Sequence, residues 1–263
     1  MALNWIDVTN LSFNTLLLLE RIQLSWFPGW VPEEELAIAL QANPVVDWYL
    51  RHKCPEIIPW LDSLLVALPL THALSAERIR QAEINILSCI NDLVVYVVNP
   101  SIYASLPELG WDSNELQSLV DFNQKIVIDI GSGTGRLAFI AAEHASVVFA
   151  VEPVGNLRLY LKQKAHELKL TNVYPVDGLI TDLPFPDRFT DITMGGHVFG
   201  DHPEAEYAEM QRVTKPGGML ILCPGTSQSE NKTHEYLLTH GFDWSEFEEP
   251  GSEMVRKYWK VVG

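Results

Sequence analysis

Three glycines at alternate positions are the residues of this sequence with the clearest capacity for chemistry. Gly131, Gly133 and Gly135 follow an apolar run, Ile-Val-Ile-Asp-Ile, at 126–130. Glycine lacks a Cβ and tolerates positive φ, so a loop of this kind brings bare backbone close to a ligand. The β-branched run before it is typical of a parallel strand that is covered on both faces. The sequence therefore predicts a strand that turns sharply into a helix around an adenosine-bearing ligand.

The spacing of the glycines separates two kinds of cofactor site. A dinucleotide loop has the pattern Gly-x-Gly-x-x-Gly, but this chain has Arg136 where the last glycine would fall. Its pattern, Gly-x-Gly-x-Gly, resembles the first motif of the class I S-adenosylmethionine-dependent methyltransferases over residues 127–135. The resemblance implies S-adenosylmethionine as cofactor and S-adenosylhomocysteine as product. It places five residues of the motif against the cofactor, namely Asp129, Gly131, Ser132, Gly133 and Gly135.

An acidic residue ends the second predicted strand. Residues 146–151 are apolar, and Glu152 follows at their carboxyl end. A carboxylate in that position can accept hydrogen bonds from both hydroxyls of a ribose. A purely structural role would be to cap the loop before the helix predicted over 154–168. The position favours the ribose role, with Pro153 beside Glu152 in the same subsite.

The third predicted strand, 172–176, also ends in an acidic residue, Asp177, which is followed by Gly178. In the methyltransferases that the chain resembles, an acid near this point receives the adenine amino group. The loop from here to the Leu-Pro-Phe segment at 183–185 is longer than in the commonest small-molecule methyltransferases, so Asp182 is an alternative. We prefer Asp177 because it ends the strand.

Two histidines and an aspartate follow the fourth predicted strand, 191–194. Ligands of doubly wound sheets lie beyond the carboxyl ends of the strands, so we expect His197, Asp201 and His202 to border the methyl group. His197 could remove a proton from the acceptor, since histidine titrates near neutral pH, or it could pack on the methionine part of the cofactor. We favour packing for His197, and polar contacts to the acceptor for Asp201 and His202.

Two further segments extend the resemblance to residues 114–263. Residues 183–189 resemble the segment before the family's fourth strand, and residues 212–218 resemble the Arg-Val-Leu-Lys-Pro-Gly-Gly turn before its fifth strand. We expect Pro216 to end the preceding helix and the glycines after it to turn the chain. The acidic face of that helix, 203–212, is expected to be solvated. The implied fold is α/β, a Rossmann-like sheet of seven strands with helices on both faces.

The residues before this core require a separate interpretation, because the methyltransferase core needs only 113–263. Residues 1–112 are predicted to be mainly α-helical, and the longest helix is expected to run from Ser75 to just before Asn99. We expect a lid or substrate domain here. Most of its aromatic residues are expected in the core and some in an apolar acceptor pocket; they are Trp26, Trp30, Trp48, Tyr49, Trp60, Tyr96, Tyr103 and Trp111.

Composition restricts the partners and the compartment. The chain has 34 acidic and 18 basic residues, a formal net charge of −16. That balance disfavours a nucleic-acid substrate and leaves a small molecule as the expected acceptor. Cys54, Cys89 and Cys223 are scattered, as expected of reduced thiols in the cytoplasm. We find no pattern of a metal site, a targeting segment or a membrane span.

Two functions from different classes remain open. The first is methyl transfer to a small molecule by in-line displacement at the sulfonium methyl, which requires alignment of the acceptor and exclusion of water. The second is a cofactor-binding scaffold that kept the fold but serves as a partner subunit or sensor. An intact Asp129, glycine loop and Glu152 favour cofactor binding under both interpretations.

Overall fold

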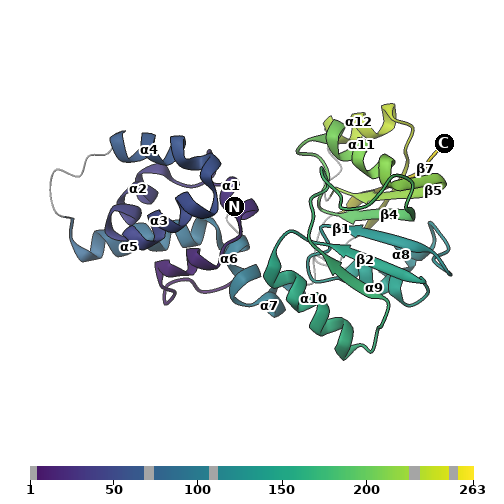
Figure 1. Ribbon diagram of the computed structural model, residues 1–263, viewed down its shortest axis with the longest axis horizontal. Coiled ribbons are helices and arrows are strands. Elements are labelled where there is room, and N and C mark those ends of the chain that lie inside the picture. Colours follow the sequence, from purple (N-terminus) through teal and green to yellow (C-terminus); the bar gives the residue numbers. More distant parts are fainter. Residues whose placement is uncertain (1–4, 68–73, 107–111, 225–231, 249–253) are drawn as a thin grey trace. The chain divides into compact units, whose positions relative to one another are not determined.

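The chain divides into two compact units, Met1–Tyr103 and Ala104–Gly263 (Figure 1). The structure is a computed structural model, and it describes residues 5–67, 74–106, 112–224, 232–248 and 254–263. Trp111, one of the aromatic residues considered for the acceptor pocket, lies outside the described residues.

The second unit begins ahead of the boundary that the sequence suggested between residues 112 and 113. Arg136, the first residue after the glycine loop, contributes to this arrangement. Its Nη2 donates to the carbonyl oxygens of Ala104 at 3.1 Å and Leu106 at 2.5 Å. A guanidinium stabilises carbonyl groups at a helix end, so the segment 104–106 is fixed to the unit that carries the glycine loop.

The first unit is helical, as predicted. Its elements are η1 (Phe13–Leu18), α1 (Arg21–Ser25), α2 (Glu33–Ala42), α3 (Pro44–Lys53), η2 (Pro55–Ile57), α4 (Ile58–Ala67), α5 (Ala76–Cys89), α6 (Asn91–Val98) and α7 (Pro100–Ala104). Its core is mainly aliphatic, with Leu36, Leu50, Leu61 and Ile86 fully buried.

The single long helix expected after Ser75 is wrong, because the chain bends by 83° between α5 and α6. The side chain of Asn91 is buried there and accepts the backbone N–H groups of Trp5 and Ile6 at 2.9 and 3.1 Å. This long-range contact interrupts a helix whose apolar periodicity continues through the bend. Among the described residues, no single helix combines the length and apolar character needed to cross a membrane; only the bent pair α5 and α6 meets that test, by length and composition.

The described tryptophans and tyrosines that the sequence analysis considered are exposed or only partly buried, contrary to the expectation that most would lie in the core. The buried aromatic side chains of this unit include Phe13 and Phe27. Three tryptophans of this unit are exposed, namely Trp26 at 41%, Trp30 at 38% and Trp48 at 59%. Others are partly buried, with their polar atoms hydrogen-bonded. The hydroxyl of Tyr49 donates to the Leu19 carbonyl at 2.8 Å, and Nε1 of Trp60 donates to Glu33 at 2.9 Å. An amphipathic ring at the surface satisfies its polar atom while its carbon face covers the core.

The second unit contains the predicted seven-stranded sheet, in the order β3-β2-β1-β4-β5-β7-β6. The strands are β1 (Ile126–Ile130), β2 (Val147–Val151), β3 (Val173–Val176), β4 (Thr190–Gly196), β5 (Thr214–Cys223), β6 (Asp243–Glu248) and β7 (Met254–Val261). The first five are parallel, and β7 pairs antiparallel with both β5 and β6. The carboxyl ends of β1 to β5 therefore meet at one edge.

Helices cover both faces of this sheet, which confirms the predicted fold class (Figure 1). They are α8 (Ser113–Gln117), α9 (Arg136–Ala142), α10 (Gly155–Glu167), α11 (Pro203–Val213) and α12 (Lys232–Thr239). Alternate residues of β1 enter different cores, because strand side chains alternate between faces. Val127 packs with residues of α8, α9 and α10, while Ile128 packs with residues of α11 and α12.

The expected turn at Pro216 is instead part of β5. Helix α11 ends at Val213, and the strand begins at Thr214 without an intervening turn. The pairing with β4 shifts between Thr190↔Thr214 and Ile192↔Met219, so the intervening residues bulge out of the ladder. Gly217, at φ +78°, still pairs with Val262 through its N–H. The proline and glycines are accommodated as a bulge, which bends a strand without ending it.

Candidate functional site

The glycine loop leaves β1 at the edge where the strand ends meet. Gly131, Gly133 and Gly135 have φ values of +61°, +53° and +90°, all in the left-handed region that favours glycine. A Cβ at Gly131 would lie 2.8 Å from Cγ2 of Val198, and one at Gly135 would lie 2.6 Å from Cδ2 of Leu161. The two outer glycines are therefore required by packing within the protein, in addition to any approach of a ligand.

Asp129 lies beneath this loop, at the end of β1, and is 1% exposed. It accepts a backbone hydrogen bond from Ala138 in the first turn of α9, whose N-cap residue, Gly135, has no side chain to do so. Its Oδ2 has no hydrogen-bond partner among the described residues. Burial raises the pKa of Asp129 to about 7, against the opposing effect of its bond with Ser132. An orphaned carboxylate oxygen here fits a cationic group, such as the ammonium of S-adenosylmethionine.

Glu152, at the end of β2, is 5% exposed and binds the backbone of two loops. Its Oε2 accepts the N–H of Gly133, and its Oε1 accepts the N–H of Val154, both at 2.9 Å. Burial raises the pKa of Glu152, while these two bonds oppose the shift. Each carboxylate oxygen has a second lone pair, so the group retains acceptor capacity for hydroxyls. Sequence reasoning weighed the capping and ribose roles as alternatives, and the geometry is compatible with both at once.

Arg158, which the sequence analysis did not select, joins the ends of β2 and β3. Its Nη1 donates to the carbonyl oxygen of Glu152 at 2.7 Å and to Oδ1 of Asp177 at 2.9 Å. The side chain of Asp177 is 73% exposed. Asp182 is also exposed and forms two backbone hydrogen bonds with Leu179. Arg158 therefore brings Asp177, but not Asp182, into one network with Glu152. The sequence did carry a signal for this residue, because Arg158 lies in the first turn of the helix that follows Glu152.

The smaller predicted cofactor residues support these loops. The hydroxyl of Ser132 donates to the carbonyl oxygen of Asp129 at 2.8 Å. Pro153 is partly buried between Glu152 and α10. A Cβ at Gly178 would lie 2.8 Å from Cδ of Pro184, so this glycine permits close packing of the loop after β3.

The loop after β4 lies next to the glycine loop. His197 is exposed, has φ +56°, and donates its N–H to the carbonyl oxygen of Cys223 at the end of β5, at 2.6 Å. Val198 packs on the end of β4 and on the glycine loop, since a Cβ at Gly195 would lie 2.7 Å from its Cγ1 and a Cβ at Gly131 would also meet it. The backbone of this loop is thus fixed, while the imidazole of His197 is at the surface.

The last part of that loop depends on Glu206, a residue that sequence reasoning had assigned to a solvated helix face. Glu206 is 1% exposed, so that expectation is wrong for this residue. Its Oε2 accepts the N–H of Gly200 and its Oε1 accepts the N–H of His202, both at 2.7 Å. Asp201, between the two anchored residues, is exposed, as is His202. An acid in the first turns of a helix that follows a glycine-containing loop was the available signal.

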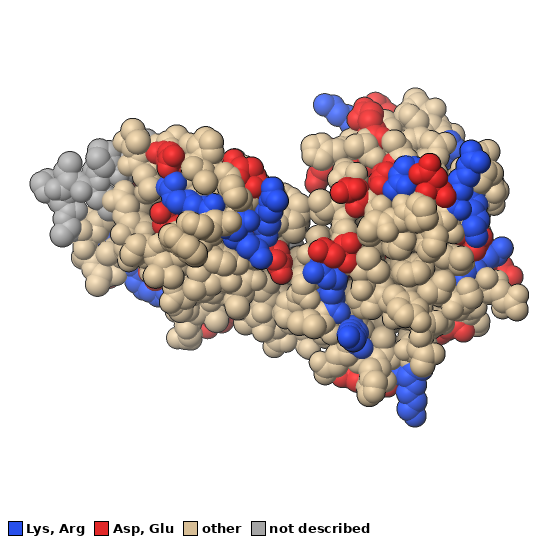
Figure 2. All heavy atoms as spheres, viewed as in Figure 1, with Lys and Arg blue, Asp and Glu red and all other residues tan. Residues whose placement is uncertain are grey.

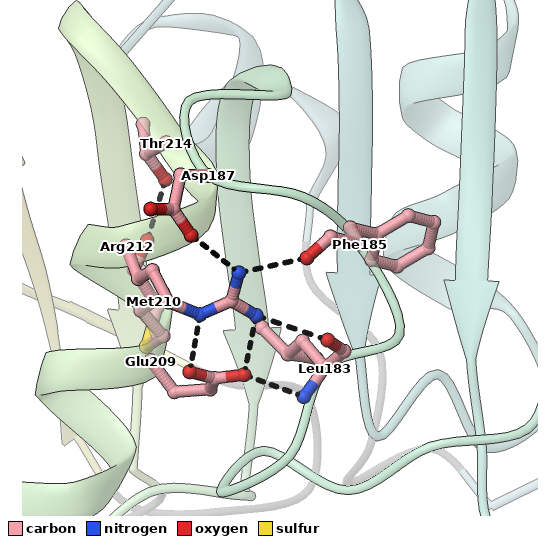
Figure 3. A network of polar contacts seen from close by, with 7 residues as sticks. All are labelled: Leu183, Phe185, Asp187, Glu209, Met210, Arg212 and Thr214. Atoms are coloured by element: carbon pink, nitrogen blue, oxygen red, sulfur yellow. Dashed lines mark hydrogen bonds and ion pairs between the residues drawn. The ribbon is translucent and has the colours of Figure 1, made fainter.

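A second missed network fixes the segment before β4 (Figure 3). Arg212 forms ion pairs with Glu209 at 2.6 Å and Asp187 at 2.9 Å, and the bond to Glu209 raises its pKa. The same guanidinium donates to the carbonyl oxygens of Leu183 and Phe185 at 3.1 and 2.8 Å. The structural role expected for residues 212–218 thus includes holding the Leu-Pro-Phe segment against α11.

Comparison with known proteins agrees with this geometry. The family model described as "Methyltransferase domain" matches residues 128–222, from β1 to β5. Residues 128–222 of the second unit are a methyltransferase domain with the class I fold. The methyltransferase domain shares its fold with the crystal structure of a SAM-dependent methyltransferase from Aquifex aeolicus, at a TM-score of 0.50 and 20% identity, over 63% of this chain and 99% of that one.

Curated relatives of the methyltransferase domain differ in what they modify. Demethylmenaquinone methyltransferase of Geobacillus kaustophilus is 32% identical over 136 residues, which is 49% of this chain and 56% of that protein. Histone-arginine methyltransferase CARMER of Anopheles gambiae is 29% identical over 132 residues, which is 48% of this chain and 21% of that protein. The chain spans between about a fifth and about half of the length of these relatives.

Proposed function

We propose that the methyltransferase domain transfers a methyl group from S-adenosylmethionine to a small-molecule acceptor. The observation that carries the proposal is the placement of buried Asp129 and Glu152 around the glycine loop, with the exposed groups of the loop after β4 beside them. The cofactor supplies an electrophilic methyl group when bound. The protein then has to bind and orient two molecules and exclude water between them.

The residues divide into a nucleoside side and a transfer side. Glu152 would accept the ribose hydroxyls, and Asp129 Oδ2 would accept the ammonium group. Asp177 is our preferred contact for adenine, with Pro153 and Gly178 lining the same side. Arg158 supports this choice over Asp182, because it connects Asp177 to the end of β2.

On the transfer side, we assign packing on the methionine part to His197 and polar contacts to the acceptor to Asp201 and His202. The test is the pH dependence of turnover. If His197 acted as the base, His197→Ala would lower the rate of the chemical step by ~10² to 10⁴ and remove the acidic limb of the pH–rate profile. Under our assignment the affinity for the cofactor falls and the limb persists. Unchanged turnover and pH dependence in alanine variants of all three residues would refute a role for this loop.

The net charge of the chain and the share of each relative's length that it matches support a small acceptor. The chain carries a net charge of −16, and on the face seen in Figure 2 the basic side chains of both units have acidic ones beside them. Such a surface does not suit a phosphate backbone. The match also covers 56% of the demethylmenaquinone enzyme but 21% of the histone enzyme. We therefore place quinol-like and other neutral small acceptors ahead of proteins.

We further propose that the helical unit is a lid or substrate domain. Its exposed tryptophans at positions 26, 30 and 48 offer aromatic surface for an apolar acceptor. Cofactor binding is then expected to slow proteolysis within residues 1–103 as well as in the glycine loop. A fragment that begins at Ser113 and is fully active on the natural acceptor would exclude this role.

The decisive experiment is methyl transfer from S-adenosylmethionine with a labelled methyl group. We would present quinols, phenols, amines and thiols, a metabolite extract, and a histone-tail peptide, each with the wild type and with Gly133→Val. We expect the wild type to transfer the label to a small molecule and Gly133→Val to transfer none. Label in the peptide alone would contradict the small-molecule assignment, and cofactor binding with no transfer to any arm would favour the scaffold.

A further inference from the structure

We propose that Glu206 is a positioning residue, whose buried carboxylate holds the loop 197–202 in the shape that receives the methionine half of the cofactor. The proposal rests on the proposed function, because it assumes that S-adenosylmethionine occupies this edge of the sheet. Glu206 is 1% exposed, so its carboxylate would act on a ligand through the loop that it holds.

The contacts of Glu206 are directed at the loop and not at its own helix alone. Its two oxygens each accept a backbone N–H at 2.7 Å, one from Gly200 and one from His202. Asp201 is therefore held between two anchored amides. Hydrogen bonds to an ionised carboxylate are the strong ones, and this carboxylate lies near the amino-terminal end of α11, where the helix dipole favours a negative charge.

The loop needs such an anchor because its backbone is unusual. Gly200 has φ +133°, and His197 has φ +56°, which is rare for a residue with a side chain. His202, the N-cap residue of α11, makes no side-chain capping bond. Glu206 accepts the N–H of this N-cap residue and that of Gly200 in the loop, so one group links the shape of the loop to the start of α11.

The loop 197–202 is held at three points, so two of them would remain if Glu206 were replaced. His197 is bonded to the end of β5, Val198 packs on Gly131, and the far end is bonded to Glu206. In the strand order β3-β2-β1-β4, Glu152 and this loop lie on opposite sides of β1. A cofactor with its ribose at Glu152 must extend its amino-acid half toward the loop. Loss of Glu206 should therefore affect one half of the ligand.

That expectation separates positioning from general stability. We would compare Glu206→Gln with the control Glu204→Gln, which removes an exposed charge from the same helical turn. Calorimetry would use two probes, S-adenosylhomocysteine and 5′-methylthioadenosine, which lacks the amino-acid half. Glu206→Gln is expected to lower the affinity for S-adenosylhomocysteine about tenfold, as for lost hydrogen bonds to a charged group. The affinity for 5′-methylthioadenosine is expected to change less than about twofold. Glu204→Gln is expected to change neither.

Equal losses for both probes, or no loss for either, would overturn the positioning role. If neither wild-type probe bound, the proposed function would fail as well, whereas binding with equal losses would refute this inference alone. Glu206→Asp provides a second variant, since it keeps the charge but shortens the reach, and an intermediate loss confined to S-adenosylhomocysteine is expected. If both variants failed to fold, hydrogen exchange of the wild type would decide: rapid exchange at Gly200 and His202 would exclude the anchor.

Discussion

The two sides of the site are built differently. At the ends of β1 and β2, the acids selected from sequence, Asp129 and Glu152, are buried and bound to backbone. At the end of β4, the selected residues Asp201 and His202 are exposed, and a different acid, Glu206, holds the backbone. On the first side, the proposed ligand contacts and the support of the loops fall on the same groups. On the second they are separated, so substitutions should affect stability and binding together on the first side and independently on the second.

The largest effect is expected in the glycine loop. Gly133→Val should abolish binding of S-adenosylhomocysteine in calorimetry, because a β-branched residue does not adopt φ near +53° and the N–H to Glu152 would be displaced. Gly217→Val is the matched control, since Gly217 has φ +78° with no atom within 4 Å of a built Cβ. It should lower stability and leave binding intact. Retained binding in Gly133→Val would refute the glycine-loop assignment.

The next effect is a pH dependence of stability that comes from Asp129. Its pKa in the folded protein, about 7, lies above the ordinary value of 3.8. The folded state therefore favours the protonated form of Asp129. The stability that this protonated carboxyl contributes is fully present below about pH 4 and is lost as the pH rises through 7. The loss is at most about 4 kcal/mol by linkage.

Urea denaturation of the wild type and Asp129→Asn at several pH values would measure this contribution. The free energy of unfolding should fall less steeply between pH 4 and 7 in the variant than in the wild type. Some pH dependence should remain, because the pKa of Glu152 is also raised. Equal slopes would show that Asp129 ionises normally.

A smaller effect on both binding and stability is expected for Glu152→Ala. Affinity for S-adenosylhomocysteine should fall by about 1 to 3 kcal/mol, as for lost bonds to a charged acceptor. The free energy of unfolding should fall as well, since the N–H groups of Gly133 and Val154 would lose their partner. A loss of affinity with unchanged stability would break the contrast between the two sides.

On the other side, Asp201→Ala and His202→Ala should change the free energy of unfolding by less than ~0.5 kcal/mol, because both side chains are exposed. Their effect should appear in the KM for the acceptor. Chemical denaturation and steady-state kinetics measure the two quantities separately. A large loss of stability would show that these side chains support the loop, as Glu206 does.

The smallest effect is expected for Asp177→Asn. The side chain is 73% exposed and its pair with Arg158 is at the surface, so the free energy of unfolding should change by less than ~0.5 kcal/mol. A measurable loss of affinity for the adenine half, absent in Asp182→Asn, would support Asp177 as the adenine contact. The reverse result would favour Asp182.

The sequence by itself determined the sheet, the glycine loop and the positions of Asp129 and Glu152. These features depend on neighbouring residues: a β-branched run favours a strand, and glycines at 131, 133 and 135 permit the left-handed turn that follows it.

Tertiary structure alone decided which polar groups became buried and where regular elements stopped. The bend between α5 and α6 depends on Asn91 meeting Trp5 and Ile6, far away in sequence. Glu206 is buried because the loop after β4 folds back over it. Its place in the first turns of α11 was a signal, but the exposed Glu204 lies in the same turn, so the local sequence does not say which acid becomes buried. Burial and long-range hydrogen bonds depend on which distant segments meet, and local propensity carries no information about that meeting.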